Sequence, residues 1–575
     1  MLLRPSARFL AFALPIVALC STASPVNAQP ADAPALRDAP VRYDDDLLSP
    51  AEHRARRYAL LDALPGNAVV LVFSAPVRNR QNDVDFEYRQ DSDLLYLTGT
   101  HEPGSVLLLA PGGVQVEGET VVEVLFVPPR DPAYEVWEGR CFGVEGAEQE
   151  LGIQRAVSTE QFEEILAPVL ADADRGDGTK EGGRTLYLLP RADGIPAGSD
   201  LAAQLAVLDA YLPPVVLSGP MAQRIYDVLM DLNSADAFGQ MRTMLGLAPD
   251  TDPTEQGAQV LAAVSDDALV QDVLDAVRDH ATYDAWAGWR DAYLANKPDT
   301  RFLRSHLSQA RSIKSEAELA LLQEAIDITG LALTEAIRSI EPGMAEYEVE
   351  ALIEYVFKRN GAEYPGFPSI VGSGENAVVL HYTSSRRPME AGDMVVMDVG
   401  AEVRGYTADV TRSVPVDGTF SDEQRAIYAL VLRANEAAIE ATRAGDDFRA
   451  PHRVAQAIIA EGLMDLGLID TPDEVRRFFM HGTSHYLGLD VHDAGDYGPL
   501  QPGQVITIEP GVYIAASPDV PEAYWNIGIR IEDDVLVTDG APVVLSAAIP
   551  KGLAAIEALM AETGLGNSEA GVLEP

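Results

Sequence analysis

The chain has 575 residues, of which 47% are hydrophobic and 23% charged, a composition typical of a soluble globular protein with roughly two to four domains. Its 89 acidic and 42 basic residues give a formal net charge of −47. Such a surface repels nucleic acid and anionic lipid, so we expect neither nucleic acid nor a membrane as partner. The acidity indicates high solubility or a saline habitat more than a surface for a cationic partner.

The first 28 residues have the pattern of a signal peptide. Arg4 and Arg8 form a positively charged start, residues 9–20 are an apolar stretch, and the small residues at 26–28 suit a cleavage site. This apolar stretch is shorter than the ~20 residues that a membrane-spanning helix needs, and no other stretch is long enough. We therefore expect an exported protein, periplasmic or secreted. An uncleaved membrane anchor is the alternative.

An α/β domain is expected in the first half of the chain. Residues 29–47 are rich in Ala, Pro and Asp and are interpreted as a linker, and the domain itself is placed at 48–310. Apolar runs predict strands at Ala68–Phe73, 105–109, 121–127 and 186–189. The Asp- and Ala-rich segment 232–285 has a helical pattern and is interpreted as an insertion, to which the sequence assigns no chemistry.

A second domain is expected over 311–562, followed by a tail at 563–575. Helices are predicted to begin at Ser315, Ser421 and Thr471, because each has a Glu or Gln three residues later that can complete the N-terminal cap. Strand-like segments between the helices lie at 394–400, 406–413, 505–508 and 527–537. Helices alternating with short strands of antiparallel character indicate an α+β domain.

Two aspartates in this domain stand in apolar, strand-like surroundings. Asp398 and Asp409 lie on segments joined by a short turn around Arg404 and Gly405. A hairpin here would bring the two carboxylates close together. Unpaired carboxylates so placed repel each other, and one takes up a proton unless cations lie between them. The pair therefore favours a cation site over two solvated acids.

Three histidines fall within twelve positions of one another, at His481, His485 and His492. Imidazole is the commonest nitrogen ligand of divalent metals, so this clustering favours a functional site over isolated structural histidines. His452 belongs to a helical stretch and is interpreted as structural.

Two further acids complete a possible ligand set. Glu509 ends an apolar strand, and the period-two pattern of the next strand puts Arg530 and Glu532 on one face. Taken alone, the alternating pattern of this last segment is typical of a half-buried strand with one face in solvent. Together with Asp398, Asp409 and His485, these acids give four carboxylates and one imidazole, whose −4 charge two divalent cations would neutralise. This donor set suits Mn²⁺, Co²⁺ or Zn²⁺, and two such ions about 3.5–4 Å apart can hold a hydroxide for hydrolysis.

The ordered series Asp, Asp, His, Glu, Glu resembles that of the pita-bread metallopeptidases, which include aminopeptidase P, prolidase and methionine aminopeptidase. The strings LHYT, MDVGAEVRGYTADVTRSVPV, FFMHGTSHYLGLDVHD, TIEPGVYI and GIRIEDD are most similar to aminopeptidase P. Upstream, YRQDSDLLYLTG at 88–99 and EVWEGR at 135–140 resemble the N-terminal domain of that family. The resemblance implies an α+β chain in which a pita-bread catalytic domain follows an α/β creatinase/aminopeptidase P-type domain.

The resemblance also implies an activity: release of the first residue from peptides with proline in second position, by a hydroxide bridging two divalent metal ions, with Mn²⁺ expected first and Co²⁺ or Zn²⁺ as alternatives. The residues matching the metal ligands are Asp398, Asp409, His485, Glu509 and Glu532. Those implied in catalysis are His381, Glu509, His481 and His492, with Glu509 as general base and then acid. Those matching the proline subsite and its surroundings are His481, His492, Tyr513 and Arg530. A homo-oligomer, dimer or tetramer, is also implied.

Two alternatives remain open on sequence grounds. Prolidase has the same ligands but acts on dipeptides, and one sequence does not settle substrate length. A non-catalytic pita-bread module that binds peptides would be expected to lose ligands, whereas all five matching positions keep acidic or His residues. Methionine aminopeptidase leaves the upstream α/β domain unexplained.

Overall fold

The computed structural model describes residues 48–171, 183–189, 195–211, 220–249, 251–294 and 301–567. The predicted signal peptide and linker, and residues 568–575 of the predicted tail, lie outside these residues. None of the described helices is long and apolar enough to cross a membrane. The segment Arg130–Cys141, with helix α3 (Pro132–Glu138), forms a unit of its own, and the other described residues belong to a second unit.

A five-stranded sheet forms the centre of the first half of that second unit. Its strand order is β6 (Ala156–Ser158), β5 (Glu119–Val127), β4 (Val106–Val116), β1 (Ala68–Phe73) and β7 (Thr185–Leu188). The inner strands pair antiparallel, and β6 and β7 join the two edges in parallel. The four predicted strands are confirmed. Strand β4 extends past the predicted end because the pairing with β5 resumes after an irregularity between Leu109 and Val114.

Alternate residues of this sheet face two different cores. Val70, Leu107 and Leu125 point to the face packed by α1 (Pro50–Ala63), α2 (Ser92–Thr98) and α12 (Arg301–Ser312). Their neighbours Val69 and Leu108 point to the face packed by α5 (Phe162–Ala171) and α6 (Asp200–Tyr211). The first of these cores is continuous with the core of the C-terminal half.

The helical pattern expected at 232–285 is confirmed and is part of a longer helical region with its own core. Five helices follow one another: α7 (Pro220–Met230), α8 (Ala235–Met244), α9 (Glu255–Ala263), α10 (Ala268–Asp279) and α11 (Tyr283–Leu294). Their shared core contains Trp286, which is fully buried and stacks on Phe238 with ring centroids 5.4 Å apart. Short elements elsewhere are the hairpin β2 (Asn79–Gln81) and β3 (Val84–Asp85) and helix α4 (Gly143–Glu150).

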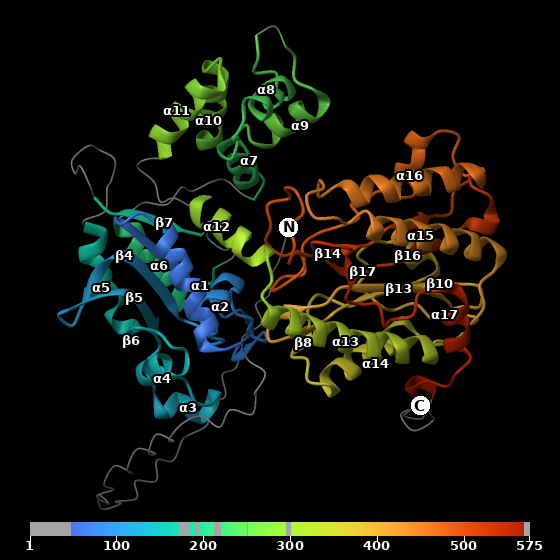
Figure 1. Ribbon diagram of the computed structural model, residues 1–575, viewed down its shortest axis with the longest axis horizontal. Coiled ribbons are helices and arrows are strands. Elements are labelled where there is room, and N and C mark those ends of the chain that lie inside the picture. Colours follow the sequence, from blue (N-terminus) through green and yellow to red (C-terminus); the bar gives the residue numbers. More distant parts are fainter. Residues whose placement is uncertain are drawn as a thin grey trace, which may run out of the picture. The chain divides into compact units, whose positions relative to one another are not determined.

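The C-terminal half places short strands between two pairs of helices (Figure 1). One pair is α13 (Glu316–Ser339) with α14 (Glu346–Arg359), and the other is α15 (Asp422–Glu440) with α16 (Ala450–Asp465). The capping boxes predicted at Ser315 and Ser421 are present. The helix predicted after Thr471 is only a 3₁₀ segment, Pro472–Arg477, and the Thr471 side chain does not cap it.

The strands between these helices form small antiparallel sheets. One contains β9 (Ile370–Ser373), β10 (Met394–Val399) and β13 (Val410–Pro415), and another β8 (Tyr364–Pro365), β11 (Ala401–Val403) and β12 (Tyr406–Thr407). A third contains β14 (Val505–Ile508), β17 (Asp533–Leu536) and β18 (Val543–Val544), and a pair is formed by β15 (Gly511–Ile514) and β16 (Ile527–Arg530). Helix α17 (Leu553–Met560) is the last α-helix of the described residues, and a short 3₁₀ helix, Leu565–Asn567, follows it.

Two of the predicted strands are interrupted, each at an acidic residue. The segment 406–413 breaks at Asp409. The backbone N–H of Asp409 donates to the side-chain carboxylate of Asp534 instead of to a backbone carbonyl of a paired strand. The segment 527–537 breaks at Glu532, whose N–H donates to the carbonyl of Thr411. The expected hairpin around Arg404 and Gly405 is confirmed, because β10 pairs antiparallel with β13 and β11 with β12, but its strands are not continuous. Strand β10 pairs with β13 so that Asp398 lies opposite Thr411, and Asp409 precedes β13.

Candidate functional site

Asp398 lies near the end of β10 and is almost completely buried. Its Oδ2 accepts a hydrogen bond from Nη2 of Arg530 at 2.5 Å. Its Oδ1 is also buried and has no hydrogen-bond partner among the described residues. A buried carboxylate oxygen without a partner is costly, so this atom is suited to bind a cation.

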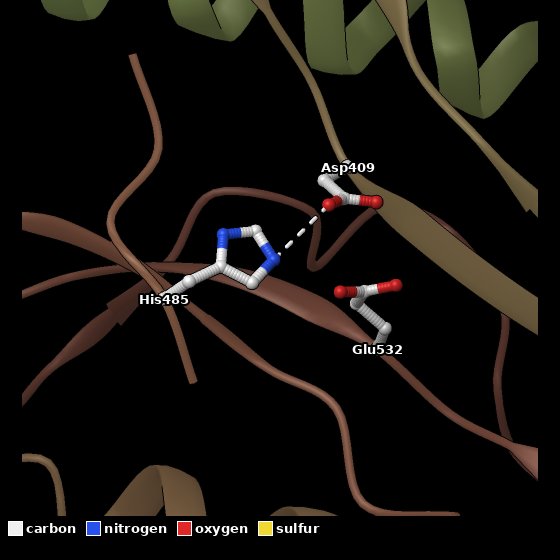
Figure 2. Close-up of side chains that lie close together, drawn as sticks. All are labelled: Asp409, His485 and Glu532. Carbon is white, nitrogen blue, oxygen red and sulfur yellow. Dashed lines mark ion pairs between the residues drawn. The ribbon is translucent and has the colours of Figure 1, made fainter. Parts of the chain in front are cut away.

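Asp409, His485 and Glu532 converge so that one ligand atom from each lies within 4.8 Å of the others (Figure 2). Nε2 of His485 is 3.3 Å from Oδ2 of Asp409 and 3.8 Å from Oε1 of Glu509. On the other side of the ring, Nδ1 lies 3.0 Å from the carbonyl of Tyr486. That carbonyl accepts from Nδ1, so Nε2 is the nitrogen that faces the acids, the orientation of a metal-binding histidine.

Two residues that the sequence reasoning did not single out support these acids. The Thr411 hydroxyl donates to Oε2 of Glu532 at 2.6 Å and accepts from Nε of Arg530 at 3.0 Å. Asp534 accepts the N–H of Asp409 at 3.2 Å. Both residues could have been found from the sequence. Thr411 lies two positions after Asp409 and Asp534 two positions after Glu532, and residues two apart in an extended chain lie on the same face.

The acids of this cluster hold protons unusually strongly. Burial, followed by the charges of Asp398 and Asp534, raises the pKa of Asp409 well above its usual range. Burial, followed by the charge of Asp409, does the same to the pKa of Glu532. Burial raises the pKa of Glu509 to about 7 against the opposing charges of His485 and Arg530. The cluster therefore needs positive charge, and divalent cations fit its four carboxylates and one imidazole.

A hydrogen-bonded chain lies beside the acids. His481 Nδ1 is 2.7 Å from the Gly482 carbonyl, which places its proton on Nδ1, and His481 Nε2 lies 2.9 Å from the hydroxyl of Tyr513. The Tyr513 oxygen also accepts from Nη1 of Arg530 at 2.9 Å. Burial, and then the charge of Arg530, lowers the pKa of His481 to about 4. His481 is therefore neutral near pH 7, and its Nδ1 is 3.4 Å from Oε2 of Glu509.

The remaining two histidines chosen from the sequence lie at the exposed side of the cluster. The His492 ring meets the His485 ring edge to face, with centroids 4.3 Å apart. Burial, followed by the charges of His485 and His381, lowers the pKa of His492. His381 is exposed in the loop after β9 and is close enough to act electrostatically on His492. His452 lies outside the acid cluster, with Nδ1 2.9 Å from the Thr483 hydroxyl.

Comparisons with known proteins cover both halves of the chain. Residues 320–539 match the model of metallopeptidase family M24, and residues 53–176 match that of the aminopeptidase P N-terminal domain. The Xaa-Pro aminopeptidase of Haemophilus influenzae is 34% identical over 521 residues, covering 88% of this chain and 97% of the relative. That of Escherichia coli is 33% identical, with 89% of this chain and 98% of the relative covered.

Solved structures agree with these matches. Escherichia coli aminopeptidase P with the inhibitor Pro-Leu has a TM-score of 0.66 and 33% identity, with 90% of this chain and 99% of that chain covered. The Zn-substituted form of that protein, in complex with product, has a TM-score of 0.67. Aminopeptidase PepP of Pseudomonas aeruginosa has a TM-score of 0.66 and 31% identity, with 90% and 98% covered. The predicted fold class, an α+β chain with a pita-bread domain after an α/β domain of aminopeptidase P type, is confirmed.

Proposed function

Because the chain belongs to the aminopeptidase P family of M24 metallopeptidases, we propose that it removes the N-terminal residue from peptides whose second residue is proline. The observation that carries this proposal is the convergence of the family-matching acids and His485 on one buried centre. That centre retains a complete donor set, which a module that only binds peptides would not need.

The metal centre in this proposal holds two divalent ions per chain. The family implies divalent metals, and Mn²⁺ is proposed first, with Co²⁺ or Zn²⁺ as alternatives. The ligands would be Asp398, Asp409, His485, Glu509 and Glu532. When bound, such ions make a hydroxide available near neutral pH and polarise the scissile carbonyl.

The protein's own residues would handle protons and hold the substrate. Glu509, 3.4 Å from His481 and 3.8 Å from His485, would take a proton from the nucleophile and return it to the leaving proline nitrogen. His381 and His492, at the exposed side of the cluster, would donate hydrogen bonds to the oxyanion. The chain His481–Tyr513–Arg530 would form one wall of the proline subsite, with its orientation set by the hydrogen bonds on the Tyr513 oxygen.

Export and oligomerisation belong to the same proposal. The signal-peptide pattern of residues 1–28 supports a periplasmic or secreted enzyme. A homo-oligomer, dimer or tetramer, is proposed from the family resemblance. The rival activity is that of prolidase, which would use the same centre on dipeptides.

The deciding experiment incubates Arg-Pro-Pro and Ala-Pro separately with Mn²⁺-loaded and chelator-treated protein and follows the products by mass spectrometry. Release of Arg from the tripeptide, lost on chelation, supports the proposal. Cleavage of Ala-Pro alone would assign prolidase activity, and no cleavage with Mn²⁺, Co²⁺ or Zn²⁺ would favour a non-catalytic module.

Two variants and a control test the site itself. Glu509→Gln and His485→Ala are expected to abolish turnover, because each removes a ligand and Glu509→Gln also removes the proton carrier. His306→Gln changes a histidine of α12 that stacks on Phe302 and is expected to leave turnover unchanged. Full activity in either site variant would contradict the assigned site.

A further inference from the structure

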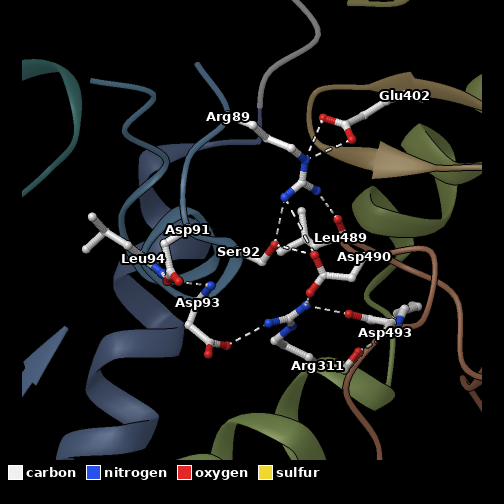
Figure 3. A network of polar contacts seen from close by, with 11 residues as sticks. Arg89, Asp91, Ser92, Asp93, Leu94, Arg311, Glu402, Leu489, Asp490 and Asp493 are labelled. Atoms are coloured by element: carbon white, nitrogen blue, oxygen red, sulfur yellow. Dashed lines mark hydrogen bonds and ion pairs between the residues drawn. The ribbon is translucent and has the colours of Figure 1, made fainter. Parts of the chain in front are cut away.

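The loop that carries His492 has neither helix nor strand from Gly488 to Asp493. Its main-chain hydrogen bonds are few: Asp493 donates to the Tyr486 carbonyl, Gly488 accepts from the N–H of Thr407, and Gly488 donates to the Asp490 carbonyl within the loop. A loop with so few main-chain bonds depends on its side chains for a fixed position. Asp490 and Asp493, which stand two positions before and one position after His492, supply those contacts (Figure 3).

Asp493 is buried and paired with two cations. Its Oδ2 accepts from Nζ of Lys314 at 2.7 Å, and its Oδ1 accepts from Nη2 of Arg311. Burial opposes ionisation, but the charges of Lys314 and Arg311 hold the pKa of Asp493 below its usual range. The closeness of this contact requires a glycine at 488, because a Cβ there would lie 2.1 Å from Oδ2 of Asp493.

Asp490, which precedes His492 in the sequence, binds the same arginine as Asp493, which follows it. Its Oδ2 accepts from Nη2 of Arg311 at 2.6 Å, and its Oδ1 accepts from the Ser92 hydroxyl at 2.7 Å. Arg89 donates to the carbonyl of Leu489 and, at 3.0 Å, to the carboxylate of Glu402. The loop is therefore held by Ser92 and Arg89 of the N-terminal half and by Arg311 and Lys314, which lie at the junction of the two halves.

Arg311 contacts both Asp490 and Asp493. It is 5% exposed, lies near the end of α12, and also donates to Oδ1 of Asp93 at 2.7 Å. Asp93 is fixed in turn, because Asp91 caps the start of α2 by accepting the N–H groups of Asp93 and Leu94. A guanidinium presents five N–H donors in a planar fork, so Arg311 binds Asp93 through Nη1 and both Asp490 and Asp493 through Nη2.

We propose that Arg311 is a positioning residue, which ties α2 to both flanks of the His492 loop and so holds the His492 ring against His485. The proposal rests on the proposed function for its catalytic consequence, but the structural part stands by itself. On this proposal the N-terminal half helps to position a catalytic residue, although the residues proposed for catalysis all belong to the C-terminal half.

The test compares Arg311→Met with Arg304→Met, a matched control on the same helix. Arg304 pairs with Asp231 and is 39% exposed, so its loss leaves the His492 loop untouched. Asp490→Asn is a second site variant, because the Asp490 side chain is 41% exposed and its change does not threaten folding. The first readout is hydrogen–deuterium exchange of peptides covering 487–500, which needs no activity. Faster exchange there in Arg311→Met and Asp490→Asn, but not in Arg304→Met, supports the proposal, and unchanged exchange overturns it.

The second readout is kinetic. Arg311→Met is expected to lower kcat by about 10- to 100-fold with little change in KM, because a displaced His492 no longer meets the transition state. The double variant Arg311→Met/His492→Ala should be no slower than His492→Ala alone, since Arg311 acts through His492. Multiplied losses in the double variant would overturn the proposal. If the wild-type protein cuts no Xaa-Pro peptide, the proposed function fails, and the exchange data still decide whether Arg311 holds the loop.

Discussion

Nη2 of Arg530 lies 2.5 Å from Oδ2 of Asp398, inside a group of four neighbouring carboxylates. Both side chains are buried, and Arg530 also binds Tyr513 and Thr411. Arg530 thus offsets part of the negative charge and joins the acids to the wall proposed for the proline subsite.

Replacing this arginine should destabilise the metal-free protein. Arg530→Met leaves Asp398 buried with no cation, and breaking a buried pair in this way lowers the free energy of unfolding by about 3–5 kcal/mol. Urea unfolding in the presence of chelator measures this. The control is Arg425→Met, whose partly exposed pair with Glu557 should contribute less than about 1 kcal/mol. Equal losses in the two variants would show that Arg530 does not balance the acids.

The stability of the metal-free protein should fall as the pH rises. The pKa of Glu509 is raised to about 7, and those of Asp409 and Glu532 are raised further above their usual range. A raised pKa means that the folded state binds more protons, so the stability is present below about pH 4, the range of unfolded carboxyl groups, and declines as the pH passes through about 7. Thermal unfolding in chelator from pH 5 to 8 measures this decline.

Divalent metal should reverse the decline. Cations replace the protons on the acids, and a ligand at a hundredfold excess over its Kd stabilises the folded state by about 2.7 kcal/mol per site. Mn²⁺ added at pH 8 should therefore raise Tm more than Mn²⁺ added at pH 5. An equal rise at both pH values would argue that the metal binds elsewhere.

Thr411 should matter for metal affinity without being a ligand. Its hydroxyl fixes Oε2 of Glu532 at 2.6 Å, and removal of such a supporting hydrogen bond weakens metal binding by about 10- to 100-fold. Isothermal titration of Mn²⁺ into Thr411→Val measures the effect. Thr411→Ser keeps the hydroxyl and serves as control, with affinity close to that of the wild type. Undiminished binding by Thr411→Val would remove this residue from the site.

Gly400 allows the close approach of the two chain segments that carry the aspartates. A Cβ at this position would lie 1.7 Å from the carbonyl oxygen of Ala408, a backbone atom that cannot turn away. Gly400→Ala should therefore displace Asp409 and lose both metal binding and turnover. Gly66→Ala has no atom within 4 Å of the new Cβ and should behave as wild type. Normal metal content in Gly400→Ala would refute the argument.

The elements of the fold were largely predictable because their signals are local. Capping at Ser315 and Ser421 and the apolar run Ala68–Phe73 depend on residues within one or two turns, and the structure places those elements as predicted. The breaks at Asp409 and Glu532 were not predictable in this way. Each depends on a bond to a residue more than 100 positions away, Asp534 in one case and Thr411 in the other.

The sequence alone determined which chemistry this protein can carry: the types and order of the acids and histidines point to a metallopeptidase centre, because side-chain chemistry does not depend on the fold. Only the tertiary structure decided which groups support them. Arg311 is remote in sequence from Asp93, Asp490 and Asp493, and Thr411 is remote from Glu532. Tertiary packing determines these partners. A buried charge is stable only when it is hydrogen-bonded to a neighbour, and the fold decides which residue lies close enough.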